Sequence, residues 1–312
     1  MSETPYILGA GSLGLLWAAR CARAGIDCRL ILRTPAALRE WQDRDSVLLL
    51  ERQGAVESIQ VTAELADSSE TPIRRLIITT KAWAVAGALE SIAPRLRADS
   101  QLVLLQNGLG SQQAVSERFP TQRVLYASTT DGAWKRAANQ VVWAGTGQTL
   151  LGDPRQEPAP APAPEWLALL TQAGIDWRWE REILPVLWLK LAINCAINPI
   201  TALHDCPNGE VPERAGPLFG PLLVELHTLL ASQSVQLGQT ELIERVHAVI
   251  QATAANSSSM RQDVHAGRRT EIDFILGHAC RTARLAGLTT PVLDALHQQL
   301  QSHLINLGLP PD

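Results

Sequence analysis

Short apolar runs and helical patterns alternate along the first half of the chain. The runs are rich in Ile, Leu and Val, which is typical of buried strands, while the segments between them repeat apolar residues at helical spacing. Strands are predicted at residues 6–8, 28–32, 76–80, 102–105, 124–128, 141–143, 149–151 and 175–179, and helices at 35–43, 85–96, 112–118 and 165–173. Strands that alternate with helices predict a mostly parallel, doubly wound α/β sheet.

The second half of the chain has only helical patterns. They cover residues 182–202, 217–236, 240–253, 259–266, 271–286 and 292–307. A stretch of Pro and Ala at residues 154–164 cannot lie inside a regular element and is predicted as an exposed loop. We therefore predict two domains, an α/β domain at residues 1–180 and an all-α domain at residues 181–312.

Composition and charge narrow the class of protein. Hydrophobic residues make up 46% of the 312 residues, and 27 basic against 31 acidic residues give a net charge of −4, which does not favour nucleic acid as a partner. Five widely spread cysteines, an odd number, indicate a reducing, cytoplasmic compartment. The N-terminus lacks a basic segment and glycines interrupt the apolar run after it, so we expect neither a signal peptide nor a membrane span.

Lysine is rare in this chain. The only lysines are Lys81, Lys135 and Lys190. The surroundings of a lysine can lower its pKa so that it gives up a proton, whereas an arginine stays charged at ordinary pH. The three positions are therefore candidates for chemistry, although a chance surface substitution explains Lys135 equally well.

A glycine motif, Gly9-Ala10-Gly11-Ser12-Leu13-Gly14, lies between the first strand and a helix. In that context it predicts a dinucleotide site. Gly9 permits the tight turn, Gly11 lets the backbone approach a pyrophosphate, and Gly14 lets the helix pack closely on the strand. The helix N-terminus adds amide groups and a positive dipole that favour an anion.

The ends of three strands indicate which dinucleotide binds. Arg33 follows the second strand, where an arginine pairs with a 2′-phosphate and an acidic residue would bind a ribose hydroxyl, so NADP(H) is the predicted cofactor. Lys81 is either a second cation for the adenosine phosphate or a solvated loop lysine. Asn107 either reaches the nicotinamide or forms an ordinary turn with Gly108.

A polar stripe interrupts the most apolar helix. Residues 187–199 are predicted to be buried on most sides, yet Lys190, Asn194 and Asn198 recur every four residues. Burying these side chains without hydrogen-bond partners would cost about 1–3 kcal/mol for each amide and more for the lysine charge. These groups either satisfy one another or line a cleft for a small polar substrate, in which a partly desolvated Lys190 would act as a general acid.

A second polar cluster, residues 256–259, precedes Thr270 and Glu271. Serine, asparagine and glutamate at helix starts are first of all caps, and the residues alone favour that interpretation. The seven histidines are scattered without metal-ligand spacing, so no metal site is predicted.

These motifs together resemble the ketopantoate reductase (2-dehydropantoate 2-reductase) family. The resemblance covers the glycine motif and residues 81–83, 106–108, 190–199, 206–210, 258–260 and 269–273. It implies a 6-phosphogluconate-dehydrogenase-like fold, in which a Rossmann-type domain precedes a helical domain. It also implies NADPH-dependent reduction of 2-dehydropantoate to (R)-pantoate, on the route to pantothenate and coenzyme A.

The resemblance assigns roles to individual residues. Lys190 would be the proton donor. The implied NADPH-binding residues are Gly9, Ala10, Gly11, Ser12, Leu13, Gly14, Arg33, Lys81, Asn107, Ala133 and Glu271. The implied substrate-binding residues are Lys190, Asn194, Asn198, Asn208, Asn256, Ser257, Ser258 and Ser259. The Asp131-Gly132 pair departs from the pattern expected next to Ala133.

Two other functions stay open. One is a related NADPH-dependent reductase of another small 2-oxo acid, which relative activity on several 2-oxo acids would distinguish. The other is a non-catalytic NADP-binding regulator, which has no use for a buried polar stripe. A small 2-oxo acid is the expected partner, nucleic acid and membrane are not expected, and a homodimer is allowed.

Overall fold

The computed structural model describes residues 4–155 and 161–312. The centre of the Pro/Ala stretch, residues 156–160, lies outside the described residues, as do residues 1–3. The chain divides into two compact units. The α/β unit comprises Met1–Gln106 and Ser111–Ile183, and the helical unit comprises Asn107–Gly110 and Leu184–Asp312. The boundary predicted after residue 180 lies close to the main division at residue 183.

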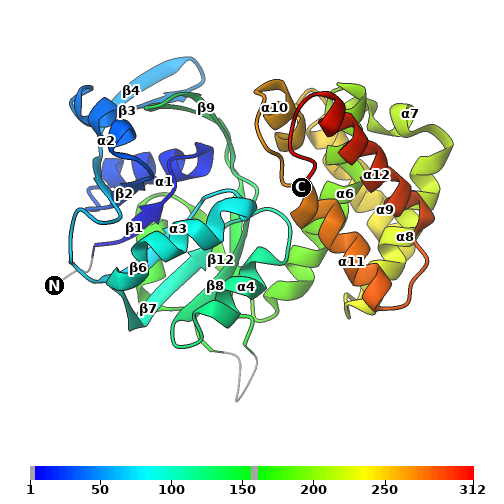
Figure 1. Ribbon diagram of the computed structural model, residues 1–312, viewed down its shortest axis with the longest axis horizontal. Coiled ribbons are helices and arrows are strands. Elements are labelled where there is room, and N and C mark those ends of the chain that lie inside the picture. Colours follow the sequence, from blue (N-terminus) through cyan, green and yellow to red (C-terminus); the bar gives the residue numbers. More distant parts are fainter. Residues whose placement is uncertain (1–3, 156–160) are drawn as a thin grey trace. The chain divides into compact units, whose positions relative to one another are not determined.

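An eight-stranded sheet forms the centre of the α/β unit (Figure 1). Its order is β12-β11-β8-β7-β6-β1-β2-β5, and the β11–β8 pair alone is antiparallel. The strands are β1 (Tyr6–Leu8), β2 (Arg29–Leu32), β5 (Thr62–Leu65), β6 (Ile73–Ile78), β7 (Leu96–Leu104), β8 (Arg123–Thr129), β11 (Gln148–Gly152) and β12 (Asp176–Trp179). β1 is buried along its whole length, as the centre of a doubly wound sheet requires. The predicted α/β class is confirmed.

Five helices accompany these strands: α1 (Ser12–Arg23), α2 (Pro35–Gln42), α3 (Val85–Ile92), α4 (Ser111–Arg118) and α5 (Ala168–Gln172). The helix predicted at residues 85–96 is wrong beyond Ile92. Pro94 lies in the next turn, where its ring would clash with an α-helical backbone, and a short 3-10 segment (Ala93–Arg95) leads into β7 instead.

A second sheet of four strands was not predicted, and the strand predicted at residues 141–143 belongs to this sheet rather than to the main one. Its order is β4-β3-β10-β9, built from β3 (Val47–Arg52), β4 (Ala55–Gln60), β9 (Gly132–Ala137) and β10 (Gln140–Gly145). Gln53 and Gly54 join β3 to β4 with φ values of 51° and 82°, as in a two-residue type I′ hairpin. All four strands contact α1, which therefore lies between two sheets. This explains why residues 14–21 of α1 are all buried.

Arg20 is the buried cation of this double layer. It is 1% exposed, pairs with Asp131 at 3.0 Å, and donates to the carbonyl oxygens of Ala173 and Gly174. Its guanidinium also lies 4.5 Å from the centroid of the Trp143 ring. The unexpected Asp131 thus has a structural partner, which fixes α1 to the segment before β9.

The helical unit is built around the long helix α6. Its elements are α6 (Ile183–His204), the 3-10 turn η4 (Asn208–Glu210), α7 (Val211–Ala215), α8 (Phe219–Ser232), α9 (Gln239–Ala252), α10 (Ser259–His265), the π-helical turn η6 (Asp273–Gly277), α11 (His278–Leu285) and α12 (Pro291–Asn306). The predicted all-helical second half is confirmed. The helix predicted at residues 271–286 is wrong in its first turn, which is π-helical, a form that often marks functional positions.

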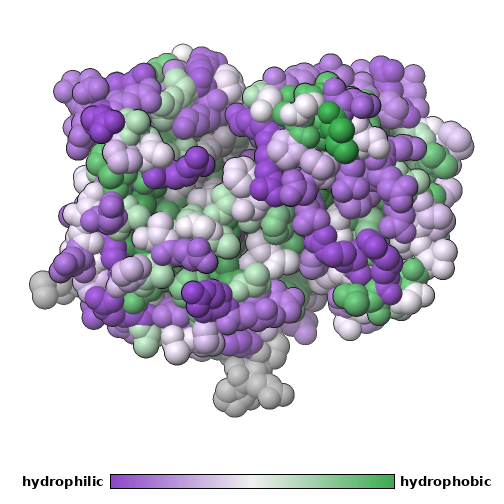
Figure 2. Space-filling view, viewed as in Figure 1, coloured by the Kyte–Doolittle hydropathy of each residue, from purple (hydrophilic) through white to green (hydrophobic). Residues whose placement is uncertain are grey.

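α6 is the single helix within residues 4–155 and 161–312 that is long and apolar enough to cross a membrane. Of its most apolar window, 61% is buried inside the protein, and a buried core helix passes the same test of length and composition. Figure 2 shows hydrophilic residues spread over the visible surface of both units, with apolar residues scattered among them.

Candidate active site

The glycine motif forms a tight turn between β1 and α1. Gly9 has a φ of +113°, and a Cβ there would lie 2.9 Å from Thr80 Cγ2. A Cβ on Gly14 would lie 1.9 Å from the carbonyl oxygen of Gly9, so no other residue permits this approach of helix and strand. Gly11 is exposed and the first turn of α1 has no side-chain cap. The turn is an open cradle of backbone amides that suits a pyrophosphate.

Arg33 follows β2 directly and is exposed at the carboxyl end of that strand. The next residue, Thr34, caps α2 by accepting a hydrogen bond from the Ala37 amide at 3.2 Å. The chain therefore turns into a helix immediately after Arg33, and no acidic residue stands at this strand end. In this fold, that position contacts the 2′ group of the adenosine ribose.

Two buried oxygens at the ends of β6 and β7 have no hydrogen-bond partner among the described residues: Thr80 Oγ1 and Gln106 Oε1. The Gln106 amide nitrogen donates to the carbonyl oxygens of Ile78 at 2.9 Å and Thr80 at 3.2 Å, which orients the amide. A buried acceptor without a donor costs about 1–3 kcal/mol. Hydroxyl or amide groups of a dinucleotide would remove this cost. Lys81, beside Thr80, is half-buried.

Residues Asn107–Gly110 follow β7 but belong to the helical unit. Gly108 has a φ of +76°, and a Cβ there would lie 2.2 Å from the carbonyl oxygen of Phe274. The same oxygen accepts a hydrogen bond from the Leu109 amide at 2.9 Å. Only glycine fits so close to another backbone. The Asn-Gly pair therefore does more than turn the chain, because it attaches the half-buried Asn107 to η6.

α6 carries the polar residues that were predicted to share one face. Lys190 and Asn194 lie inside the unit but keep some accessible surface, and Asn198 is buried. Burial lowers the pKa of Lys190 to about 8, and the negative charge of Glu271 opposes this shift. Glu271 is itself buried, just before η6. A lysine of this kind is protonated at pH 7 and releases its proton readily, as a general acid must.

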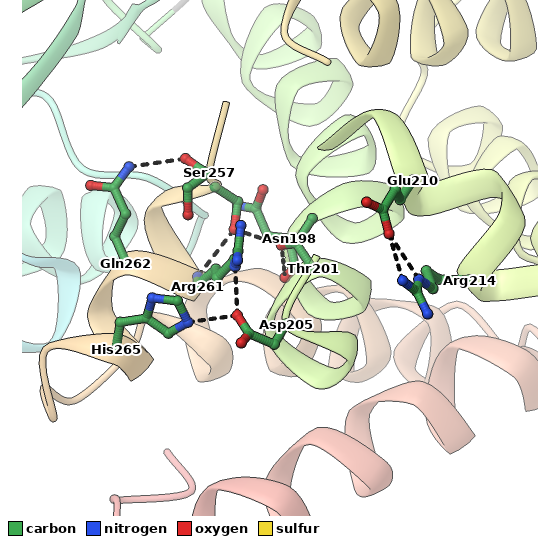
Figure 3. A network of polar contacts seen from close by, with 10 residues as sticks. Asn198, Thr201, Asp205, Glu210, Arg214, Ser257, Arg261, Gln262 and His265 are labelled. Atoms are coloured by element: carbon green, nitrogen blue, oxygen red, sulfur yellow. Dashed lines mark hydrogen bonds and ion pairs between the residues drawn. The ribbon is translucent and has the colours of Figure 1, made fainter. Parts of the chain in front are cut away.

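The first turn of α10 is fixed to the end of α6 by a polar network (Figure 3). Ser258 Oγ accepts a hydrogen bond from the Arg261 amide at 3.1 Å and lies 2.7 Å from Thr201 Oγ1. The Arg261 side chain donates to Asp205 at 2.8 Å, and His265 contacts the same carboxylate at 2.6 Å. The capping interpretation is confirmed for Ser258.

Two oxygens beside this network have no partner in the described part of the chain: Ser257 Oγ and Asn208 Oδ1. The side-chain nitrogen of Asn208 donates to Thr253 Oγ1 at 2.9 Å, and its backbone amide donates to the Asn256 carbonyl at 3.0 Å. Asn256 and Ser259 are exposed. The fold thus brings Asn208 to the predicted serine cluster and leaves two buried acceptors for a ligand with donor groups.

Ala133 lies in a different setting from the other predicted cofactor residues. It pairs with β10 in the second sheet and packs against the core of the α/β unit. Two residues later, Lys135 Nζ donates to the carbonyl oxygen of Ala10 in the glycine turn at 3.0 Å. Thr80 and Gln106 were not among the predicted site residues, and only the scarcity of lysine had singled out Lys135. Their position at predicted strand ends could have indicated the first two, but Lys135 lies in a strand that the sequence did not predict.

A broad hollow of about 610 Å³ is lined by Leu203 of α6 and by residues of α12. It contains none of the predicted site residues. Each unit instead has its own candidate residues: the glycine turn, Arg33, Thr80 and Gln106 in the α/β unit, and Lys190, Asn208 and Ser257 in the helical unit.

Comparison with protein families gives two matches that together span most of the chain. Residues 6–156 match the family described as ketopantoate reductase PanE/ApbA, and residues 182–303 match the C-terminal region of that family.

Individual proteins of known identity agree with these matches. The 2-dehydropantoate 2-reductase of Vibrio cholerae is 37% identical over 298 residues, 95% of this chain and 96% of that protein. The protein of the same name from Pyrococcus horikoshii is 30% identical over 291 residues, 92% of this chain and 93% of that protein.

Two solved structures share the fold. A PanE/ApbA family ketopantoate reductase from Ralstonia eutropha has a TM-score of 0.85 at 22% identity, and D-mandelate dehydrogenase in a ternary complex with NADH and anilino(oxo)acetate has a TM-score of 0.89 at 20% identity. Each alignment covers 98% of this chain and 100% of the other. Because both family matches and relatives of nearly full length agree, the chain belongs to the ketopantoate reductase family.

Proposed function

We propose that this protein reduces 2-dehydropantoate to (R)-pantoate with NADPH, in the cytoplasm, as a step towards pantothenate and coenzyme A. The name shared by relatives from Vibrio cholerae and Pyrococcus horikoshii supports this reaction. The observation in the structure that carries it is Lys190, an ammonium group with a pKa of about 8 on α6, where Asn194 and Asn198 follow at four-residue intervals.

In this proposal the α/β unit holds the cofactor. The glycine turn binds the pyrophosphate, Arg33 binds the 2′-phosphate, and Lys81 adds positive charge beside the turn. Thr80 and Gln106 supply acceptors for hydroxyl or amide groups. NADPH, when bound, supplies the hydride that adds to the C2 carbonyl carbon of the substrate.

The helical unit supplies the proton. As the carbonyl oxygen gains negative charge, the Lys190 ammonium stabilises it and then donates a proton to form the hydroxyl group. Glu271 favours the charged form of Lys190, because its negative charge raises the pKa that burial lowers. Asn194, Asn198 and Ser257 hydrogen-bond the hydroxyl and carboxylate groups of the substrate.

NADPH oxidation with 2-dehydropantoate, followed by the absorbance of the reduced nicotinamide, tests this function. We expect turnover with NADPH, little with NADH, and a loss of about 10²–10⁴-fold in kcat for Lys190→Ala. Leu184→Ala is the matched control, since Leu184 is exposed on the same helix, and it should keep full activity. A protein that binds NADPH in a fluorescence titration but does not turn over 2-dehydropantoate would contradict the proposed substrate.

A second candidate is the reduction of another small 2-oxo acid. A D-mandelate dehydrogenase has the same fold, so the fold alone does not select 2-dehydropantoate. The amides and hydroxyls of the helical unit also suit many small oxo acids. Comparing kcat/KM for 2-dehydropantoate with kcat/KM for branched and aromatic 2-oxo acids separates the two candidates, and a clearly higher value for one of the others would favour the second.

A further inference from the structure

We propose that Lys135 is a second specificity-determining cation for NADPH, which contacts the 2′-phosphate together with Arg33. The inference rests on the proposed cofactor and concerns a residue outside the motifs that define the family resemblance. It assigns part of the preference for NADPH over NADH to the second sheet, which the sequence did not predict.

The position of Lys135 follows from the second sheet. β9 is an edge strand of that sheet, which contacts α1. Lys135 is exposed, and its Nζ donates to the carbonyl oxygen of Ala10 at 3.0 Å. This bond places the ammonium beside the glycine turn. A lysine ammonium is a compact positive charge with three N–H donors, the kind of group that binds phosphate oxygens.

Lys135 also lines a cavity of about 60 Å³ at the end of β2. Leu32, the last residue of β2 and the neighbour of Arg33, also lines it, as does Ala10. The other charged residues that line the cavity, Glu40 and Arg44, pair with each other at 2.9 Å, and Lys135 adds one more basic side chain to the lining. In this fold the adenosine ribose lies beside the end of β2, where a 2′-phosphate would meet this charge.

Lys81 and Lys135 come from different parts of the α/β unit. Lys81 follows β6, and β1 separates β6 from β2 in the sheet order. Lys135 belongs to the second sheet and lines the cavity at the end of β2 itself. The inference therefore adds Lys135 to the cations already proposed for the cofactor.

The competing interpretation is purely structural. If Lys135 only fixes β9 to the glycine turn, its removal disturbs the pyrophosphate cradle and weakens NADPH and NADH alike. If it contacts the 2′-phosphate, its removal weakens only ligands that carry this group. The two interpretations therefore differ in the ratio of the effects on the two cofactors.

The experiment compares Lys135→Met with the parent, using kcat/KM for NADPH and NADH and calorimetric Kd values for 2′,5′-ADP and 5′-AMP. We expect a loss of about tenfold or more for NADPH and 2′,5′-ADP and less than about twofold for NADH and 5′-AMP. Lys135→Arg should retain most of the affinity for 2′,5′-ADP. Arg136→Met removes a charge from the adjacent position, which pairs with Glu51, and should change neither ratio.

Equal losses for NADPH and NADH, or no loss for either, would overturn the inference. The binding of 2′,5′-ADP needs no turnover, so the result for Lys135 stands even if 2-dehydropantoate is not the substrate. A parent protein that binds 2′,5′-ADP no more tightly than 5′-AMP would instead refute the proposed cofactor, and the inference with it.

Discussion

In the proposed mechanism Lys190 must hold its proton in order to donate it, so its pKa of about 8 would set the upper pH limit of the reduction. Below that pH the ammonium form dominates and the rate stays constant. Above it, the rate falls about tenfold for each pH unit, because the neutral amine cannot act as an acid. We expect a plot of log kcat/KM for 2-dehydropantoate against pH to be flat up to about 8 and then to descend.

Glu271→Gln tests the cause of this pKa. The charge of Glu271 raises the pKa of Lys190, so removing that charge should move the break in the pH profile to a lower pH. Glu241→Gln is a matched control, since Glu241 forms an exposed pair with Arg245 on α9. A break that stays in place in Glu271→Gln would contradict the electrostatic coupling, whatever happens to the absolute rate.

Two neighbouring serines show where a local sequence pattern stops predicting hydrogen bonds. Ser257 and Ser258 are neighbours of the same type, and the sequence predicts a cap for either. In the structure, Ser258 Oγ contacts Thr201 and the Arg261 amide, whereas Ser257 Oγ has no partner among the described residues. This difference depends on a side chain 57 residues away from Ser258, which no local pattern reveals.

Among the elements, the contact between α1 and β1 depends most directly on one residue. A Cβ on Gly14 would lie 1.9 Å from the Gly9 carbonyl, so Gly14→Ala must push the helix from the strand and distort the turn. We expect the free energy of unfolding to fall by more than about 2 kcal/mol and NADPH binding to weaken. Urea denaturation and a fluorescence titration with NADPH measure the two effects.

Gly87→Ala is the control for helix propensity. Gly87 lies in α3, and a Cβ there would have no neighbour within 4 Å. Alanine is the better helix former, so this variant should gain up to about 1 kcal/mol. If both substitutions had the same effect, close packing at Gly14 would not be the reason for its glycine.

The elements that the sequence predicts best are those buried in the main sheet. β1 and β6 are apolar runs, and an apolar run is itself the signal of a buried strand. β9 has three exposed residues in succession and lies at a sheet edge, so pairing with β10 defines it rather than its own pattern. Its own pattern therefore did not indicate the contact of Lys135 with the glycine turn, and Ala133 on the same strand was indicated only by the family resemblance.

At the scale of the whole molecule, the layers of the α/β unit depend on a buried ion pair. Arg20 and Asp131 have side chains that are each 1% exposed. Asp131→Asn would leave the Arg20 charge buried without a counter-charge, and we expect it to lower the free energy of unfolding by about 3–5 kcal/mol. Asp99→Asn should cost less than about 1 kcal/mol, because the Arg74–Asp99 pair is exposed. Similar losses in urea denaturation would contradict this reasoning.

The division into two units could be predicted only in part. The change from alternating elements to continuous helices places the boundary near residue 181, and the structure divides the chain at Ile183 and Leu184. No change in the sequence pattern indicates that Asn107–Gly110 belong to the helical unit. This attachment depends on the approach of Gly108 to the Phe274 carbonyl, which exists only in the folded chain.

The scarcity of lysine affects how this protein can be handled. All three lysines have a part in the proposed function: Lys81 and Lys135 as cofactor cations of the α/β unit and Lys190 as proton donor of the helical unit. Dyes, biotin and sensor surfaces that couple to lysine side chains would therefore modify proposed ligand-binding groups rather than inert surface, and the pKa of about 8 favours the reactive neutral amine of Lys190 near neutral pH. The five cysteines are buried, so thiol reagents offer no simple alternative. Protection by ligand against amine modification would then report directly on occupancy.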